Sequence, residues 1–201
     1  SQLLTGLLMA LPVVPDDSEI KVRNLKSRPY IDMTLQILKD FGIVIHNDNY
    51  SLFRIPGNQK YTPCEYTVEG DWSGGAFLLV AGAINGDLTV TGLQSSSRQS
   101  DKAILSALKD AGANLTVNDD IITITPSKLK AFSFDATHAP DLFPPLAALA
   151  SYCDGVSTIT GVSRLIHKES NRADAICQEF CKIEIGRAHV LTPVTSVNIV
   201  C

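Results

Sequence analysis

Three stretches of this 201-residue chain carry the same strand pattern, and the repeat limits what the chain can fold into. The pattern stands at Ser18–Leu25, Asp87–Leu93 and Val156–Val162, at a spacing of about 70 residues. A second signature, Leu38–Gly42, recurs as Leu108–Gly112. Self-similarity at a fixed period indicates one supersecondary unit used repeatedly, so we expect three copies of one unit.

Each copy is predicted to run helix, strand, helix and then a strand hairpin, because apolar residues recur at helical spacing in some segments and alternate in others. In the first copy we expect helices and strands at Gln2–Leu11, Ile20–Leu25, Tyr30–Phe41, Ile43–His46 and Ser51–Ile55, with a turn at Asn47–Asn49. In the second they are expected at Ser73–Ile84, Leu88–Leu93, Ser100–Ala111, Ala113–Val117 and Ile121–Thr125, with a turn at Asn118–Asp120. In the third they are expected at Phe132–Asp135, Asp141–Cys153, Val156–Val162 and Glu169–Cys181, and the copy then stops where its hairpin should begin.

This order predicts an α/β fold. Strands linked through a helix favour parallel pairing with right-handed crossovers, and the closing hairpin is expected to make each sheet mixed. The Pro- and Gly-containing stretch Pro56–Pro63 is typical of a domain boundary. We therefore predict that residues 1–60 end one domain, that residues 61–183 form two repeats of a second, and that residues 184–201 are a non-native tail.

Both ends of the chain are unusual. It starts inside a helical pattern without Met, and its tail loses helical periodicity at Glu184. The tail resembles a translated sequencing-adapter read-through, which is best excluded from fold reasoning. We therefore expect a fragment truncated at both ends.

Composition argues against several classes of protein. A net charge of −4 provides no basic field for nucleic acid or an acidic membrane surface, and no apolar run approaches the length of a membrane span. The five cysteines include no CxxC pair and are read as reduced thiols of a cytosolic protein. His46, His138 and His167 do not cluster in the sequence, so no metal site is predicted.

Basic residues stand close to the start of the second helix in every copy. The third copy is the richest, with Lys168 and Arg172 four residues apart and therefore on one helix face. Free backbone N–H groups together with Lys or Arg make an anion site. The alternative is a solvated first turn, in which Glu169 and Asp174 screen the two cations.

Asp141 follows Pro140 and precedes an apolar helix. It is either the N-cap of that helix or a carboxylate near the Lys168 cluster that is available for proton transfer. Ser1 and Gln2 open the first helix, where they are either an ordinary helix start or hydroxyl, amide and N–H donors for a phosphate.

Five motifs in one order resemble the 5-enolpyruvylshikimate-3-phosphate synthase (3-phosphoshikimate 1-carboxyvinyltransferase) family, over Ser1 to about Ile183. They are Ser1–Ala10, Arg28–Thr34, Glu69–Ser73, Pro140–Asp141 and His167–Arg172. Five motifs at matching spacing are far more specific than any one of them.

The resemblance implies the enolpyruvyl transferase fold, two domains of βαβαββ-type repeats with pseudo-threefold symmetry, of which about half is present. It implies transfer of the carboxyvinyl group of phosphoenolpyruvate to the 5-hydroxyl of shikimate 3-phosphate with release of phosphate. That reaction belongs to the shikimate pathway of chorismate and aromatic amino-acid biosynthesis, and the family is the target of glyphosate. It also implies a cytoplasmic monomer that needs no metal or organic cofactor and has no nucleic-acid or membrane partner.

The resemblance further implies a role for each matching residue. Ser1, Gln2, Ser27 and Tyr30 match residues that bind shikimate 3-phosphate. Asp141 matches the aspartate that holds the attacking hydroxyl and accepts its proton. Lys168 matches a lysine that contacts both substrates, Glu169 a glutamate implicated in proton transfer, and Arg172 an arginine that binds phosphoenolpyruvate. Lys168 or Glu169 would protonate the methylene carbon, and the sequence does not choose between them.

One departure and three alternatives remain. The last motif more often reads Ser-Asp-Arg, whereas Asn171 precedes Arg172 here, which would leave Arg172 less neutralised. The resemblance also implies further Lys and Arg residues in the substrate site that this fragment lacks. We therefore expect the fragment alone to be inactive. The alternatives are the sister transferase acting on UDP-N-acetylglucosamine, a non-catalytic repeat scaffold in which Asp141, Lys168 and Arg172 do not converge, and a coding fragment that does not fold alone.

Overall fold

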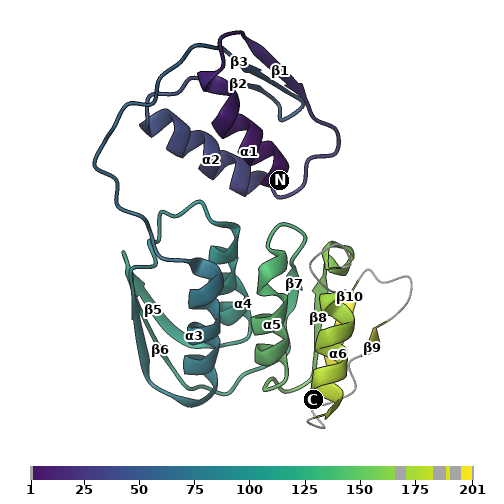
Figure 1. Ribbon diagram of the computed structural model, residues 1–201. Coiled ribbons are helices and arrows are strands. Elements are labelled where there is room, and N and C mark those ends of the chain that lie inside the picture. The colour runs from purple at the N-terminus through teal and green to yellow at the C-terminus, as the bar shows by residue number, and fades with distance from the viewer. Residues whose placement is uncertain (1, 166–170, 183–188, 191–195, 201) are drawn as a thin grey trace. The chain divides into compact units, whose positions relative to one another are not determined.

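The computed structural model describes residues 2–165, 171–182, 189–190 and 196–200. Its internal contacts divide the chain into two compact units, each described by itself below (Figure 1). Unit 1 comprises Ser1–Val68 with Arg98–Ser100, and unit 2 comprises Glu69–Ser97 with Asp101–Cys201. Among the described residues, no helix is long and apolar enough to cross a membrane.

Unit 1 packs two helices on one small sheet. Its elements are α1 (Gln2–Ala10), η1 (Leu11–Val13), β1 (Ser18–Lys21), α2 (Arg28–Asp40), β2 (His46–Asp48) and β3 (Leu52–Ile55). All pairing in the sheet is antiparallel in the order β1-β3-β2, with Ile20 opposite Phe53. Ile31 and Leu38, two turns apart on α2, pack with Leu8 of α1 and Phe53 in one core. The α2 helix is thus held by its apolar stripe.

Unit 2 continues the same alternation over a longer stretch. Its elements are α3 (Trp72–Asn85), β4 (Leu88–Thr91), η2 (Ser100–Ala103, of which Ser100 is grouped with unit 1), α4 (Ile104–Asp110), β5 (Asn114–Asn118), β6 (Ile121–Thr125), β7 (Ser133–Asp135), η3 (Pro140–Leu142), α5 (Phe143–Ala150), β8 (Val156–Thr160), η4 (Val162–Arg164), α6 (Arg172–Lys182), β9 (His189–Val190) and β10 (Ser196–Val200). In Figure 1, α3, α5 and α6 lie side by side. One core joins the helices and strands from α3 to α6, with Trp72, Leu79, Leu108, Phe143 and Leu146 among its buried members.

The sheets differ from the expected pairing. Parallel pairing was predicted for strands joined through a helix, but β6 lies between β4 and β5 and pairs antiparallel with both, as β3 does between β1 and β2. The prediction is wrong for these two copies because the return strand of each hairpin occupies the central position. The parallel pair that the structure describes is β7 with β8, where Asp135 stands opposite Thr160.

The hairpins also differ in detail. The first is predicted to turn at Asn47–Asn49, but its central residues are Asn49 and Tyr50, both with positive φ (46° and 59°). The loop is three residues long, because Asp48 pairs with Leu52, and the left-handed backbone of its first two residues reverses the chain. The third copy was expected to stop before its hairpin, yet β10 pairs antiparallel with β8 and with β9. The pairing of β10 with β8 therefore repeats that of β6 with β4.

Close packing of α3 on its sheet depends on glycine. A Cβ added at Gly82 would lie 2.4 Å from Ile124 Cγ2 and 3.1 Å from Leu88 Cβ. We expect Gly82→Ala to lower the free energy of unfolding of unit 2 by about 1–3 kcal/mol, because the core must shift to admit a methyl group. Urea unfolding followed by far-UV circular dichroism measures this. Gly86→Ala is the control, because Gly86 has extended backbone and nothing within 4 Å of its added Cβ. Equal stability of the two variants would contradict the packing.

Candidate active site

The ends of two neighbouring parallel strands build a site in unit 2. The chain leaves β7 at Asp135 and reaches Asp141 through a short turn, and it leaves β8 at Thr160 before it reaches Arg172. Because β7 and β8 run parallel, both segments start from the same edge of the sheet. The carboxyl ends of parallel strands are where α/β folds place ligands.

Asp141 and Arg172 meet at this edge. Arg172 Nη1 donates a hydrogen bond to Asp141 Oδ1 at 2.6 Å, and the two side chains are 29% and 32% exposed. A charge-assisted bond of this length in a half-buried setting is stronger than a solvent-exposed pair. Both residues were predicted as site residues, and they lie 31 positions apart in sequence, so tertiary structure brings them together.

The N-cap interpretation of Asp141 is wrong. Asp141 lies inside the 3-10 turn η3, and α5 begins at Phe143, after Leu142, which makes no side-chain capping bond. Pro144 and Pro145 occupy the first turn of α5, where backbone N–H groups have no helical acceptor. The carboxylate of Asp141 is therefore directed to Arg172 rather than to the helix start.

Asn171 caps α6 and fixes the backbone next to Arg172. Its carbonyl accepts from Ala175 N at 3.1 Å, and its Nδ2 donates to Asp174 Oδ2 at 2.6 Å. The departure from the usual Ser-Asp-Arg was expected to leave Arg172 less neutralised. Arg172 has a carboxylate partner in Asp141, and the effect of Asn171 on its neutralisation stays a prediction.

Three predicted site residues, Ser1, Lys168 and Glu169, lie outside the described residues. The helix predicted over Glu169–Cys181 is described from Arg172 to Lys182. The shared helix face of Lys168 and Arg172 therefore stays a prediction. Among the described residues, no group of three or more His, Cys, Asp or Glu side chains is arranged to hold a metal ion.

Unit 1 carries the other predicted residues at the starts of its two helices. Gln2 is exposed in the first turn of α1, and Tyr30 is half-buried in the first turn of α2. The hydroxyls of Thr5 and Thr34 lie 3.3 Å apart and join the two helices.

Ser27 has an unusual backbone. It is 3% exposed and has left-handed φ and ψ of 55° and 48° directly before α2. A buried non-glycine residue in this region costs about 1–3 kcal/mol and persists only where its surroundings hold it. Such strain gathers at ligand sites, but nothing in the sequence signalled it, because serine is also an ordinary helix N-cap.

A polar cluster next to Ser27 was missed by sequence reasoning. Tyr50 donates its hydroxyl hydrogen to Asp32 Oδ1 at 2.7 Å, and the Arg28 guanidinium stacks over the Tyr50 ring at 5.0 Å from its centroid. The hydrogen bond to Asp32 raises the pKa of Tyr50. The left-handed backbone of Tyr50 directs this ring, and tyrosine gives no sequence signal for that conformation.

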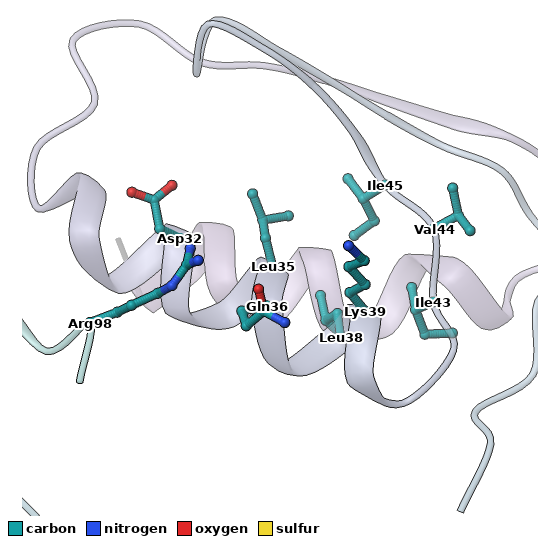
Figure 2. A pocket seen from close by; sticks show the side chains of 9 residues that line it. All are labelled: Asp32, Leu35, Gln36, Leu38, Lys39, Ile43, Val44, Ile45 and Arg98. Carbon is teal, nitrogen blue, oxygen red and sulfur yellow. The ribbon is translucent and has the colours of Figure 1, made fainter. Parts of the chain in front are cut away.

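A hollow of about 330 Å³ runs along α2 in unit 1 (Figure 2). Asp32, Gln36 and Lys39 line it from the helix, and the segment of residues 43–45 lines it with apolar side chains. Arg98, grouped with this unit by its contacts, completes the lining. The lining includes none of the predicted site residues, so this hollow is separate from them.

Solved structures with this fold include enolpyruvyl transferases. The chain superposes on EPSP synthase from Acinetobacter baumannii with a TM-score of 0.78 at 22% identity, covering 100% of this chain and 46% of that one. It superposes on the enolpyruvyl transferase NikO from Streptomyces tendae with a TM-score of 0.61 at 18% identity, covering 94% and 43%. At these identities the likeness establishes the fold class, that of enolpyruvyl transferases.

Sequence comparison is more specific. A sequence model of the family EPSP synthase (3-phosphoshikimate 1-carboxyvinyltransferase) matches residues 1–187. A 3-phosphoshikimate 1-carboxyvinyltransferase of Clostridium novyi is 42% identical over 184 residues, which are 91% of this chain and 42% of that protein. One from Methanococcus maripaludis is 39% identical over 189 residues, 91% of this chain and 44% of that protein. The chain belongs to the EPSP synthase family, and it spans less than half the length of these relatives.

The ion pair in the site makes a prediction about stability. We expect Arg172→Ala to lower the free energy of unfolding by about 1–2 kcal/mol, because it leaves a half-buried carboxylate without its cation. Lys182→Ala removes an exposed pair with Glu179 on the same helix and is expected to cost less than about 0.5 kcal/mol. Urea unfolding of both variants, with Asp141→Asn and the Asp141–Arg172 double variant completing a cycle, measures the coupling. Additive effects at Asp141 and Arg172 would contradict the pair.

The Tyr50–Asp32 bond makes a prediction about pH. Tyr50→Phe is expected to lower the free energy of unfolding by about 1–2 kcal/mol at pH 8. The raised pKa means that the contribution of Tyr50 is fully present below the unfolded value of about 10 and is lost as the pH rises through the folded value. The difference between the parent chain and Tyr50→Phe should therefore shrink between pH 8 and pH 11. A difference that is constant or grows with pH, measured by urea unfolding, would rule out the bond as its source.

Proposed function

We propose that the protein to which this chain belongs transfers the carboxyvinyl group of phosphoenolpyruvate to the 5-hydroxyl of shikimate 3-phosphate and releases phosphate. One observation carries the proposal. In a chain of the EPSP synthase family, the Asp141 carboxylate and the Arg172 guanidinium converge at the carboxyl ends of parallel strands. In a non-catalytic scaffold with solvated loops, these two side chains would not be expected to converge.

The two side chains suit the two demands of this reaction. The 5-hydroxyl oxygen of shikimate 3-phosphate bonds to C2 of phosphoenolpyruvate while a carboxylate accepts the hydroxyl proton. We assign the role of proton acceptor to Asp141. An acid delivers a proton to the methylene carbon, which we assign to Lys168 or Glu169 from the sequence. Loss of a proton from the resulting methyl group and of phosphate from C2 then yields the enol ether. Arg172 binds phosphoenolpyruvate, and its five N–H donors let it hold that anion beside Asp141.

The residues of unit 1 take the other substrate in this proposal. Gln2, Ser27 and Tyr30, with Ser1, bind shikimate 3-phosphate. Support comes from the strained, buried backbone of Ser27 at the start of α2 and from the helix starts that offer N–H groups to a phosphate. No metal or organic cofactor is assigned, and the intact protein is proposed to act in the cytoplasm as a monomer.

The domain assignment is part of the same proposal. Residues 1–60 end the domain that binds shikimate 3-phosphate, and residues 61–183 form two repeats of the second domain. Residues 184–201 are proposed to be a non-native tail, although the family match runs to residue 187 and so includes the first residues of this segment.

The test uses a hybrid enzyme, in which residues 1–187 of this chain replace the matching segment of the Clostridium novyi relative. We expect the hybrid to release phosphate from phosphoenolpyruvate with shikimate 3-phosphate, and not with UDP-N-acetylglucosamine. Asp141→Ala should lower kcat by about 10²–10⁴-fold because the proton acceptor is lost, whereas Asp87→Ala, at an exposed position in unit 2, should leave it unchanged. Release only with the nucleotide sugar would assign the sister activity. Release with neither acceptor would favour a scaffold.

The 201-residue chain by itself should show no turnover in the same phosphate assay. The chain alone holds only some of the cationic side chains that the proposed site requires. Such an incomplete site gives little stabilisation of a transition state formed from two anionic substrates. Turnover by the purified chain at more than background rate would overturn this expectation.

A further inference from the structure

The segment that carries Asp141 is anchored by a residue to which no role has been assigned. Asp135 is the last residue of β7, and its Oδ1 accepts a hydrogen bond from Thr137 N at 2.9 Å. This local bond closes a turn directly after the strand. Ala139 N then bonds to the carbonyl of Ala136 at 3.1 Å, and η3 with Asp141 follows. The path from β7 to Asp141 is therefore a run of short, hydrogen-bonded turns.

The same turn is locked to the end of β8. Ala136 N donates to the carbonyl of Thr160 at 3.0 Å, and Asp135 stands opposite Thr160 in the parallel pairing of β7 with β8. Gly161 follows with φ of 92°, and a Cβ there would lie 2.6 Å from Thr137 N and 2.9 Å from Thr137 Cα. Backbone thus packs on backbone where the two strands end.

The chemistry of Asp135 suits an anchor. Hydrogen bonds from Thr137, from the side chain first and then from the backbone, lower the pKa of the Asp135 carboxyl group, so that it remains ionised at neutral pH. An ionised carboxylate only accepts hydrogen bonds, which suits the bond that Asp135 accepts from Thr137 N in the turn after β7. Asp135 is itself exposed, so burial of its own side chain does not explain its place.

We propose that Asp135 is a positioning residue for Asp141: it closes the turn that Ala136 N bonds to the end of β8, and so sets the distance between the Asp141 carboxylate and the Arg172 guanidinium. Its consequence for catalysis rests on the proposed function. A small displacement of the turn is expected to affect this distance, because a 2.6 Å bond between Asp141 and Arg172 tolerates little movement of either backbone. Misplacement of a proton acceptor by about 1 Å costs about 10²-fold in rate.

The test asks whether Asp135 acts through Asp141. In the hybrid enzyme, Asp135→Ala should lower kcat about 10–100-fold while the KM for shikimate 3-phosphate changes less than threefold. Asp135→Asn keeps an oxygen acceptor for Thr137 N and should recover kcat to within about threefold of the parent. Asp87→Ala is the matched control, an exposed aspartate of the same unit, and should leave kcat unchanged. Unchanged kcat in Asp135→Ala would overturn the proposal.

A double variant separates positioning from a general loss of structure. If Asp135 acts through Asp141, then Asp135→Ala added to Asp141→Ala should lower the residual kcat less than twofold. A loss equal to that seen with Asp135→Ala alone would mean that Asp135 supports the fold in general, and would overturn the proposal.

A second readout does not need activity. In the 201-residue chain and in the hybrid, the unfolding coupling between Asp141 and Arg172 should fall to near zero in an Asp135→Ala background and persist in Asp135→Asn. Persistence of the coupling in Asp135→Ala would overturn the positioning role even if the hybrid proved inactive. An inactive hybrid with the coupling lost as expected would instead reject the proposed function and leave the positioning role supported.

Discussion

The parallel pairing of β7 with β8 is the constraint on which the site in unit 2 depends. It places Asp135 opposite Thr160, and from that edge one segment leads to Asp141 and the other to Arg172. The other helix-linked strands are separated by a returning hairpin strand, so they do not present two neighbouring ends in this way. The one parallel pairing among the described strands is thus where the Asp141 carboxylate and the Arg172 guanidinium converge.

Packing of small residues gives this edge a rigid support. The α3 helix is apolar around its circumference and has glycines where Leu93 and Ile124 approach most closely. It also packs against α5, the helix that follows Asp141. Movement of the site would therefore disturb a continuous core that includes Trp72, Leu79 and Leu146.

Unit 1 positions its predicted substrate-binding residues at the starts of its two helices. The backbone is strained at Ser27, and contacts among Tyr50, Asp32 and Arg28 support it nearby. Aromatic stacking and one hydrogen bond to a carboxylate connect the hairpin to α2. Strain held by neighbours in this way pre-organises a loop, which suits recognition of a phosphorylated substrate.

Period and motif order in the sequence determined much about this protein: the repeated unit, the helices that became α2 and α3, and the family. They also named Asp141 and Arg172 as candidate site residues. These rest on local spacing, which side-chain periodicity reports directly. Only the tertiary structure decided that hairpin strands insert between helix-linked strands, and that Asp141 bonds Arg172 instead of capping α5. It also decided that Asp135 accepts from Thr137 N and that Tyr50 bonds Asp32. Strand order, positive φ and contacts between residues distant in sequence arise from packing, and a linear pattern carries no signal for them.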